Sequence, residues 1–531
     1  MKWNARIDAL DRRQAIAALA VGAVTSIGGI VAQAMPLGDK SATILRLSEL
    51  GARQGPNADA SQALRRALTL AAKNGATIEI DGWYSVSGTF HVPAGIRIKG
   101  NGVTKSGLFH RGAGDFLMAR GPIDLDGFAI DGCRGSDDRL NAAPPGHLLG
   151  IVGPPGGYME GVRIGHIRLQ NSSRKGAALV NLADVVVDTL EFDSVWARAV
   201  ILSGIKNGRI KRIVGDDIGR LGSEKARDGV LCGIYAETDI KKAKSDWYIS
   251  AEISPTNQLS IGSIDGRRVT DTAVYVHDYL QNPVGVTNVT IDNINIDGAK
   301  DAVKVREGAS QIKIGSIIAK NVGLSGFAMD GKASHVQVDT ISVANTGYDF
   351  VGDILGHPSI QKIRGNGRGT SIQSIPAGIR ILSGCHNVTI SKFDVRASRQ
   401  RSFGKPAYGL GIWFEDSSNI VASGTTFDTD GEGARLVNCT NVDLDVQVER
   451  SCQTSGHAAL VINQQKDQRS TGIKVALTFV GGEGGNIVPL SARGVVIGEA
   501  RIHVPKSKAA FSTAKNVKRS PLPLGLRVTY F

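Results

Sequence analysis

The chain has 531 residues, of which 66 are glycine and only 5% are aromatic. Hydrophobic residues make up 42%, which is too many for a disordered chain, and the glycines show no Gly-x-y period, which excludes collagen. The net charge of +13 favours an anionic partner, and a solvated basic tail that keeps the protein soluble is the alternative. Because basic motifs that stack on nucleic-acid bases are absent, we expect an acidic polysaccharide or an envelope surface and no nucleic acid.

Residues 1–34 have the layout of an export signal. Arg12 and Arg13 precede an uncharged stretch that ends in the cleavage pattern Ala32-Gln33-Ala34. The arginine pair resembles a twin-arginine signal, which implies export of a folded chain by the twin-arginine machinery. We therefore expect a periplasmic or secreted bacterial protein without a stable transmembrane segment. A general secretion signal and an uncleaved anchor are the alternatives.

Residues 35–103 are predicted to form an N-terminal capping segment. A helix is expected to begin at Asn57-Ala58-Asp59 and Ser61 and to end at Asn74-Gly75, because glycine favours the left-handed conformation that closes a helix. One side of this helix carries the apolar residues Leu64, Ala67, Leu68 and Ala71. An amphipathic helix of this kind can cover the open edge of a stack of strands.

Residues 104–500 contain an internal repeat of about 23 residues. Short polar–apolar–x–apolar segments start at Gly161, Asp184 and Asn207, which are equally spaced along the chain. Later segments of the same form start at Asn288, Gln311, His335, Asn387, Asn419 and Asn441. Asparagine at this recurring position suits left-handed turn geometry and can form a ladder of side-chain hydrogen bonds.

The repeat predicts a β-helix, because each unit alternates with the period of two that is typical of strands. One turn of chain cannot bury its own apolar row, whereas stacked turns pair each strand with its equivalent about 4.8 Å away. The number of turns is about fifteen. A β-propeller or an array of sandwiches is the alternative, but propeller blades need about 40–50 residues and antiparallel hairpins.

The order of elements in residues 47–102 resembles the opening of pectate-lyase-superfamily and tailspike β-helix proteins. The matching parts are the helix, the turn Pro93-Ala94-Gly95 and the segment Gly100-Asn101-Gly102, whereas a single Asp59 replaces the usual acidic pair. Together with the signal, the pattern also resembles twin-arginine-exported bacterial repeat proteins. The resemblance implies an all-β fold, a right-handed parallel β-helix (a solenoid) with an N-terminal capping helix, and a carbohydrate-active function.

Aligning the second strand of successive turns predicts two outward columns of reactive side chains. Residues 234–237 are expected to stack on residues 274–277, and these on residues 303–306. The first column is Tyr235, Tyr275 and Lys304, and its neighbour is Glu237, His277 and Arg306. Asp278 and Asp330 are expected close by. Adjacent turns lie about 4.8 Å apart, within reach of side chains.

These residues supply the parts for cleaving an acidic polysaccharide by β-elimination. The reaction needs a cation on the sugar carboxylate, a base for the neighbouring proton and an acid for the leaving oxygen. Lys304 and Arg306 are expected to neutralise the carboxylate. His277 or Tyr275 is the expected base, and a tyrosine is the expected acid. The residues expected to bind substrate are Tyr235, Glu237, Asp278 and Asp330. A solvated strand face without a function is the alternative.

Two other functions stay open. Asp216-Asp217 and Asp428-Thr429-Asp430 superficially resemble acidic motifs of polygalacturonase-type glycoside hydrolases, although their order is reversed and turn geometry explains both. A non-catalytic envelope protein that binds polysaccharide along a flat face is the third possibility. No cofactor is predicted, and a calcium site stays open because no set of carboxylate ligands can be assigned.

Residues 501–531 are predicted to form a basic C-terminal tail, with seven lysines and arginines and no acidic residue. The five cysteines are scattered and form no C-x-x-C motif. Cys385 and Cys439 occupy equivalent turn positions, but two turns separate them by about 9.6 Å. This distance exceeds what a disulfide tolerates, so we expect no bond between them.

Overall fold

The computed structural model describes most of the chain from Thr43 onwards. The described residues are 43–112, 114–133, 146–173, 175–219, 229–236, 253–278, 285–347, 375–398, 409–450, 458–480, 488–503, 523 and 525–530. The predicted export signal at residues 1–34 and the candidate Glu237 lie outside these ranges.

A single helix covers the first rungs, as the sequence predicts. Strands β1 (Ile44–Arg46) and β2 (Gly55–Asp59) lead into α1 (Ser61–Asn74). The carboxylate of Asp59 accepts a hydrogen bond from the Ser61 amide at 2.9 Å. Gly75 ends the helix with a φ of 67° and donates its amide to the carbonyl oxygen of Ala71. The predicted apolar side of α1 is buried against the strands, so the capping helix is confirmed.

After α1 the chain winds in rungs with three faces, which we call A, B and C. Face A begins with β3 (Thr77–Ile80), β6 (Ile96–Gly100), β9 (Ile123–Asp126) and the first part of β12 (Val162–Ser172). Face B begins with β4 (Trp83–Val86), β7 (Gly107–His110), β10 (Phe128–Asp131) and the second part of β12. Face C begins with β5 (Phe90–Val92), β8 (Leu117–Ala119), β11 (His147–Val152) and β13 (Lys175–Ala183).

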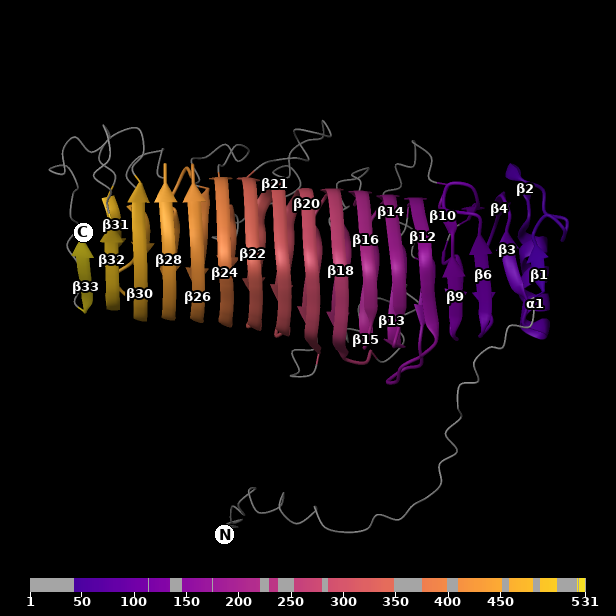
Figure 1. The fold of residues 1–531 in the computed structure, drawn as a ribbon, viewed down its shortest axis with the longest axis horizontal. Helices are drawn as coiled ribbons and strands as arrows, with labels where there is room; N and C mark the ends of the chain where they lie inside the picture. Colours follow the sequence, from indigo (N-terminus) through magenta and orange to yellow (C-terminus); the bar gives the residue numbers. More distant parts are fainter. Residues whose placement is uncertain are drawn as a thin grey trace, which may run out of the picture. The chain divides into compact units, whose positions relative to one another are not determined.

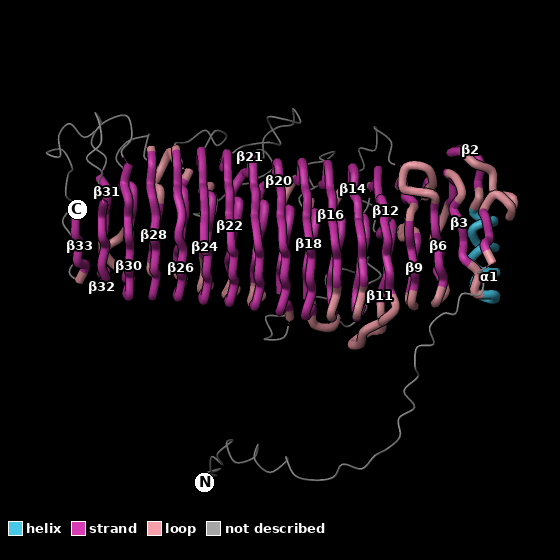
Figure 2. The backbone as a smooth tube through the Cα atoms, in the orientation of Figure 1, coloured by secondary structure: helices cyan, strands magenta, loops and turns pink. Residues whose placement is uncertain are grey.

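In the later rungs one long strand covers faces A and B, and a second strand covers face C (Figures 1 and 2). The long strands are β14 (Val186–Val195), β16 (Arg209–Ile218), β18 (Thr256–Val269), β22 (Ser334–Thr346), β24 (His386–Ser398), β26 (Ser418–Phe427), β28 (Thr440–Glu449), β30 (Arg469–Val480) and β32 (Val495–His503). The face C strands are β15 (Arg198–Lys206), β17 (Val230–Ala236), β19 (Thr272–Asp278), β23 (Ala377–Ile381), β25 (Leu410–Glu415), β27 (Ala434–Val437), β29 (Ala458–Ile462) and β31 (Val488–Ala492). β20 (Val286–Arg306) and β21 (Ser310–Asp330) run through all three faces.

The described strands pair in parallel with the equivalent strand of the next rung, so the chain is a right-handed parallel β-helix. Alternate side chains fill the interior, where Val274, Val276, Val303 and Val305 are fully buried. Propeller and sandwich arrangements are excluded because they need antiparallel strands. The β-helix class and the capping helix both agree with the prediction.

The predicted asparagine ladder forms at the turn before face A. Its members Asp184, Asn207, Asn387, Asn419 and Asn441 have φ values between 53° and 58°. The Nδ2 atoms of Asn207, Asn419 and Asn441 donate to the side chain one rung earlier at 2.7, 2.9 and 3.0 Å. The ladder fixes the register of successive rungs at a solvent-exposed corner.

The C-terminal end departs from the predicted boundary. β32 continues to His503, and β33 (Leu526–Tyr530) pairs with it in parallel, with Gly498 opposite Leu526. Residues 526–530 therefore belong to the last rung rather than to a separate basic tail. Leu526 is buried and Tyr530 packs against the core. Most residues between these two strands lie outside the described ranges.

Cys385 and Cys439 both carry free thiols, as their predicted separation requires. They stand at equivalent positions with Ser417 in the rung between them, and the Ser417 hydroxyl lies 3.7 Å from the Cys439 sulfur. Burial raises the pKa of the Cys439 thiol to about 11, so the buried sulfur stays a neutral thiol.

Candidate functional site

Face C carries most of the predicted site residues on its outer side. β19 pairs with β20 so that Tyr275 lies opposite Lys304 and His277 lies opposite Arg306. β20 pairs with β21 so that Arg306 lies opposite Asp330. Because neighbouring rungs are about 4.8 Å apart, these side chains form one patch over three rungs. We call Tyr275, His277, Lys304, Arg306 and Asp330 the face C cluster.

The expected register between β17 and β19 is wrong by two residues. Tyr235 lies opposite His277, not opposite Tyr275, and Gly233 occupies the position opposite Tyr275. A shift of two residues leaves the inward and outward alternation unchanged, so the sequence pattern cannot reveal it. Tyr235 still reaches the cluster, because its ring meets that of Tyr275 edge-on with centroids 5.8 Å apart.

Two cations and a carboxylate hold the cluster together. Asp330 accepts from the Lys304 ammonium at 3.2 Å through one oxygen and pairs with the Arg306 guanidinium through the other. Arg306 Nη1 also donates to the phenol oxygen of Tyr275 at 3.3 Å. The rings of Tyr275 and His277 lie 5.1 Å apart and 32° from parallel. A phenol, an imidazole and two cations therefore meet on one surface.

The environment moves the pKa values of the phenol and the imidazole in opposite directions. Burial, together with the charges of Arg306, Lys304 and Arg198, lowers the pKa of His277 to about 3. Burial raises the pKa of Tyr275 above its usual value, although the hydrogen bond from Arg306 opposes this effect. At neutral pH the histidine is therefore uncharged and the tyrosine keeps its proton.

Other expected residues lie at the margin of the cluster. Asp278 is 1% exposed and follows His277 on β19. Tyr235 is fully buried and packs in an apolar group with Ile201 and Ile253. Glu237 lies outside the described residues. Asp330, one of the residues expected to bind substrate, joins the ion pairs of the cluster.

Arg198 and Asp301 belong to the surroundings of the cluster, and the sequence reasoning missed both. The Arg198 guanidinium lies 5.2 Å from the centre of the Tyr235 ring. Asp301 is 2% exposed and accepts a hydrogen bond from the Ser325 hydroxyl in the next rung. Burial acts to raise the pKa of Asp301, but Lys304 and two further cations outweigh it and lower the pKa. Arg198, Thr272 and Asp301 occupy equivalent positions in different rungs of face C. A sequence alignment with the correct register would have placed Arg198 and Asp301 beside the cluster.

The carboxylates considered for a glycoside hydrolase do not come together. Asp216 lies on β16, whereas Asp428 follows β26, six rungs later. This separation is about 29 Å, compared with the ~6.5–9.5 Å that an inverting pair needs. Asp217 and Asp428 both have left-handed backbones, with φ values of 57° and 58°. Turn geometry therefore accounts for both motifs.

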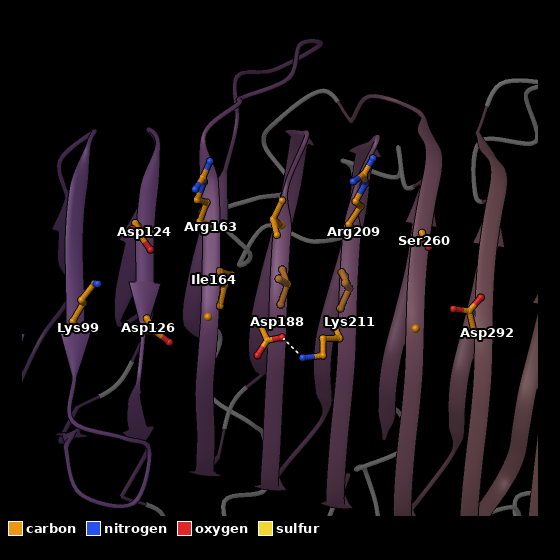
Figure 3. Close-up of a pocket in the computed structure, with 15 residues that line it drawn as sticks. Lys99, Asp124, Asp126, Arg163, Ile164, Asp188, Arg209, Lys211, Ser260 and Asp292 are labelled. Atoms are coloured by element: carbon orange, nitrogen blue, oxygen red, sulfur yellow. Dashed lines mark ion pairs between the residues drawn. The ribbon is translucent and has the colours of Figure 1, made fainter. Parts of the chain in front are cut away.

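Face A contains an open pocket of about 600 Å³, lined by residues from β6, β9, β12, β14, β16, β18 and β20 (Figure 3). Gly165 and Gly262 lie in the bend between faces A and B and contribute to the pocket. Within it, the Lys211 ammonium pairs with Asp188 at 2.9 Å. The lining residues include four cations, four carboxylates and no aromatic side chain.

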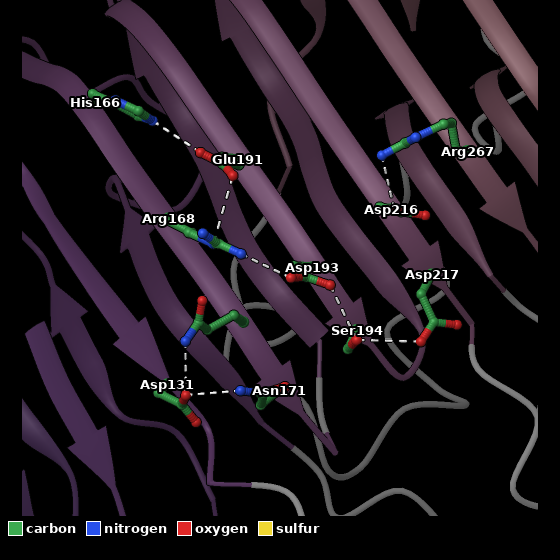
Figure 4. Close-up of polar contacts among 11 residues, drawn as sticks. Asp131, His166, Arg168, Asn171, Glu191, Asp193, Ser194, Asp216, Asp217 and Arg267 are labelled. Carbon is green, nitrogen blue, oxygen red and sulfur yellow. Dashed lines mark hydrogen bonds and ion pairs between the residues drawn. The ribbon is translucent and has the colours of Figure 1, made fainter. Parts of the chain in front are cut away.

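Face B carries a network of paired charges beside this pocket (Figure 4). Glu191 lies between His166 and Arg168, at 3.2 and 3.5 Å, and Arg168 also pairs with Asp193 at 2.8 Å. Asp216 binds Arg267 and Arg268 at 3.1 and 2.7 Å. The charges of this network are neutralised within the protein, which favours a structural role.

Among the described residues, no three His, Cys, Asp or Glu side chains are grouped closely enough to hold a metal ion. The described part of the chain also contains no helix with the length and apolar character needed to cross a membrane.

No protein-family model and no curated protein matches the chain. Solved structures resemble it at low identity. An α-1,3-glucanase catalytic unit from Streptomyces thermodiastaticus is 13% identical over 87% of this chain and 70% of its own, with a TM-score of 0.44. The A-module of a mannuronan C-5 epimerase from Azotobacter vinelandii is 13% identical over 84% of this chain and 98% of its own, with a TM-score of 0.41. Tailspike protein 2 of bacteriophage CBA120 is 12% identical over 92% of this chain and 52% of its own, with a TM-score of 0.35. Sequence identities and TM-scores as low as these support no conclusion about a reaction or a substrate of this chain.

Proposed function

We propose that this β-helix is a carbohydrate-active enzyme that cleaves an acidic polysaccharide by β-elimination at the face C cluster. The observation that carries the proposal is the meeting of Tyr275 and His277 on one strand with Lys304 and Arg306 on the next rung. The cluster thus contains a proton donor, a proton acceptor and two cations. These are the groups that elimination next to a carboxylate requires.

Each group has one task in the proposed reaction. Lys304 and Arg306 bind the uronate carboxylate, and their charge makes the neighbouring C5–H more acidic. A ring nitrogen of His277 takes the C5 proton, and the electron pair of that bond forms the C4=C5 double bond. The C4–O bond breaks, and Tyr275 gives its proton to the leaving oxygen.

The protonation states support this division of work. An uncharged imidazole can accept a proton, whereas a protonated phenol can donate one, so the opposed pKa shifts favour His277 as base and Tyr275 as acid. A bound uronate would also bring negative charge close to His277. That charge raises the pKa of the imidazole towards the working pH and makes it a stronger base.

Asp330 pairs with both cations in the resting protein, but Lys304 and Arg306 keep further N–H donors for a substrate carboxylate. An ammonium has three N–H donors and a guanidinium has five. Asp330 uses one of these on each side chain, while Tyr275 and Glu307 each use one more donor of Arg306. Lys304 and Arg306 keep side-chain exposures of 23% and 33%. A sugar carboxylate can bind the remaining donors while Asp330 holds both cations in place.

The test is to incubate the full chain with polygalacturonate, alginate and other uronate polymers and to follow the ultraviolet absorbance of the unsaturated product. Tyr275→Phe and His277→Gln should each abolish the rise. Tyr158→Phe is the matched control, since its phenol is bonded to the Pro255 carbonyl outside the face C cluster. Reducing ends without the absorbance would indicate a hydrolase, and binding without turnover would indicate a non-catalytic polysaccharide-binding protein.

The location is proposed from the N-terminal residues, which lie outside the described part of the chain. We propose that the twin-arginine machinery exports the protein to the periplasm or the exterior of a bacterial cell, where an acidic polysaccharide is accessible. Replacing Arg12 and Arg13 by lysine should retain the protein in the cytoplasm, as cell fractionation would show. Unchanged export of this double variant would instead support a general secretion signal.

A further inference from the structure

Three of the four cations in the face A pocket, Lys99, Arg163 and Arg209, form no ion pair or hydrogen bond with another described residue. Arg163, Val186 and Arg209 stand in one column on consecutive rungs of β12, β14 and β16. Neither guanidinium forms an ion pair or a hydrogen bond with any residue that the structure describes. Val186 between them is 49% exposed. Figure 3 shows both arginines extending from the strands on the same side of the pocket.

This arrangement differs from that of the neighbouring face. On the same rungs, Arg168 and Arg212 of face B each pair with a carboxylate, at 2.8 and 3.1 Å. Lys211 inside the pocket is also paired, with Asp188. The protein therefore pairs Arg168, Arg212 and Lys211 internally but leaves Arg163 and Arg209 open to an external anion.

We infer that the face A pocket is a second binding site, which holds an extended anionic polysaccharide across the rungs. Arg163 and Arg209 bind carboxylates on two sugars of the chain, because a guanidinium offers a planar fork of donors that matches a carboxylate. Their strands are two rungs, or about 9.6 Å, apart. Val186 packs against the apolar face of the sugar that lies between them.

The shape of the site favours an extended polymer over a small ligand. The pocket crosses seven successive rungs from Lys99 on β6 to Asp292 on β20, a length of about 29 Å. A polysaccharide fits better than single-stranded nucleic acid, because the lining has no aromatic side chain on which bases could stack. The side of the pocket opposite the two arginines carries Asp126 and Asp292. These carboxylates would repel a second anionic chain beside the first.

The inference goes beyond the elimination reaction and does not depend on it. The pocket lies on face A, whereas the proposed reaction takes place on face C. A polymer bound at the pocket would keep the enzyme on its substrate between cleavage events. Cleavage of short oligomers should therefore be unaffected by changes in the pocket.

The test measures equilibrium binding of the full chain to polygalacturonate and alginate at low salt, by calorimetry or affinity electrophoresis. The double variant Arg163→Ala, Arg209→Ala should bind at least about tenfold more weakly, because two charge-assisted contacts are lost. The matched control is Arg212→Ala, Arg267→Ala, which removes the same charge from face B and should bind like the wild type. Val186→Glu should also weaken binding, since its carboxylate would occupy both guanidiniums.

Three results would overturn the inference. The first is wild-type affinity in the Arg163→Ala, Arg209→Ala variant together with loss of binding in Lys304→Ala, Arg306→Ala. The second is no binding of either polymer by the wild type. The third is equally tight, arginine-dependent binding of single-stranded DNA, which would assign the pocket to nucleic acid. A missing absorbance rise would reject the lyase alone, since it does not enter the binding measurement.

Discussion

Arg306 donates a hydrogen bond across 3.3 Å to the phenol oxygen of Tyr275, from the rung that follows it on face C. The same guanidinium pairs with Asp330 in the rung beyond. The arginine therefore couples the proposed acid to the carboxylate that holds the cations in place. A change at Arg306 should affect both the charge and the position of its neighbours.

Arg306→Ala should lower kcat on a cleaved uronate polymer by about 10²–10³-fold, the typical cost of removing one group that stabilises developing charge. Arg306→Lys keeps the charge but loses the fork of donors, so it should recover only part of the rate. Steady-state kinetics measure both effects. Arg396→Ala removes an exposed arginine that is paired with Asp394 on face B and should change neither kcat nor KM. Equal losses in Arg306→Ala and Arg396→Ala would contradict the assignment.

His277 should make the stability of the fold depend on pH. Its pKa is lowered to about 3 in the folded chain from its usual value of 6.5. As the pH falls below 6.5, the unfolded chain binds this proton and the folded chain does not. The free energy of unfolding therefore falls by about 1.4 kcal/mol per pH unit, between pH 6.5 and about pH 3.

Denaturant titrations at several pH values would measure this slope. His277→Gln should flatten it, because glutamine does not titrate. His166→Gln removes a half-exposed histidine that pairs with Glu191 on face B and provides the matched control. A slope unchanged in His277→Gln would show that other groups cause the pH dependence.

The asparagine ladder should contribute measurable stability at Asn419. Its side chain donates to Asn387 at 2.9 Å and accepts from Asn441 at 3.0 Å, while its backbone has a φ of 53°. Asn419→Ala should lower the free energy of unfolding by about 1–3 kcal/mol, since alanine loses these bonds and lacks the polar side chain that lets asparagine tolerate the left-handed backbone. Asn419→Gly loses the bonds but tolerates the backbone, so it should cost less. Chemical denaturation measures both, and equal losses would mean that the backbone contributes nothing.

Glu432 and Arg435 form a buried ion pair, and removing one partner should cost more stability than replacing both. Their side chains are 2% and 7% exposed and lie 2.8 Å apart, and Arg435 also lies over the Trp413 ring. Glu432→Gln should destabilise the fold by about 3–5 kcal/mol, because it leaves a buried charge without its counterion. Adding Arg435→Met should restore part of this loss. Thermal unfolding of these two variants and the wild type would show it, and a double variant less stable than Glu432→Gln would contradict the reasoning.

The sequence predicts the fold well because the repeat appears in local features. The ladder from Asp184 to Asn441 marks the start of successive rungs, and the turns at these positions need a left-handed backbone that asparagine tolerates. α1 is likewise predictable, because its apolar side and its terminal glycine follow from helix geometry. Both kinds of evidence lie within a few residues of the feature that they predict.

The site is only partly predictable, because it depends on register between strands far apart in the chain. The predicted pairing of Tyr275 with Lys304 is confirmed, and these two residues are closer along the chain than Gly233 and Tyr275. Gly233 and Tyr275 are separated by a longer connection, and the predicted register misses their pairing by two residues. The ion pairs of Asp330 and the open arginines of face A depend on side-chain positions in neighbouring rungs. No pattern within one strand contains that information.

The face C cluster has an unusual genetic consequence. Its members come from adjacent rungs, so the whole constellation is encoded between Tyr275 and Asp330, whereas most active sites combine distant parts of a gene. Grafting this one block into the matching coils of an unrelated solenoid should transfer the arrangement as a cassette. Deleting the block in frame would remove the cluster in a single event, and the flanking rungs could then stack directly on each other.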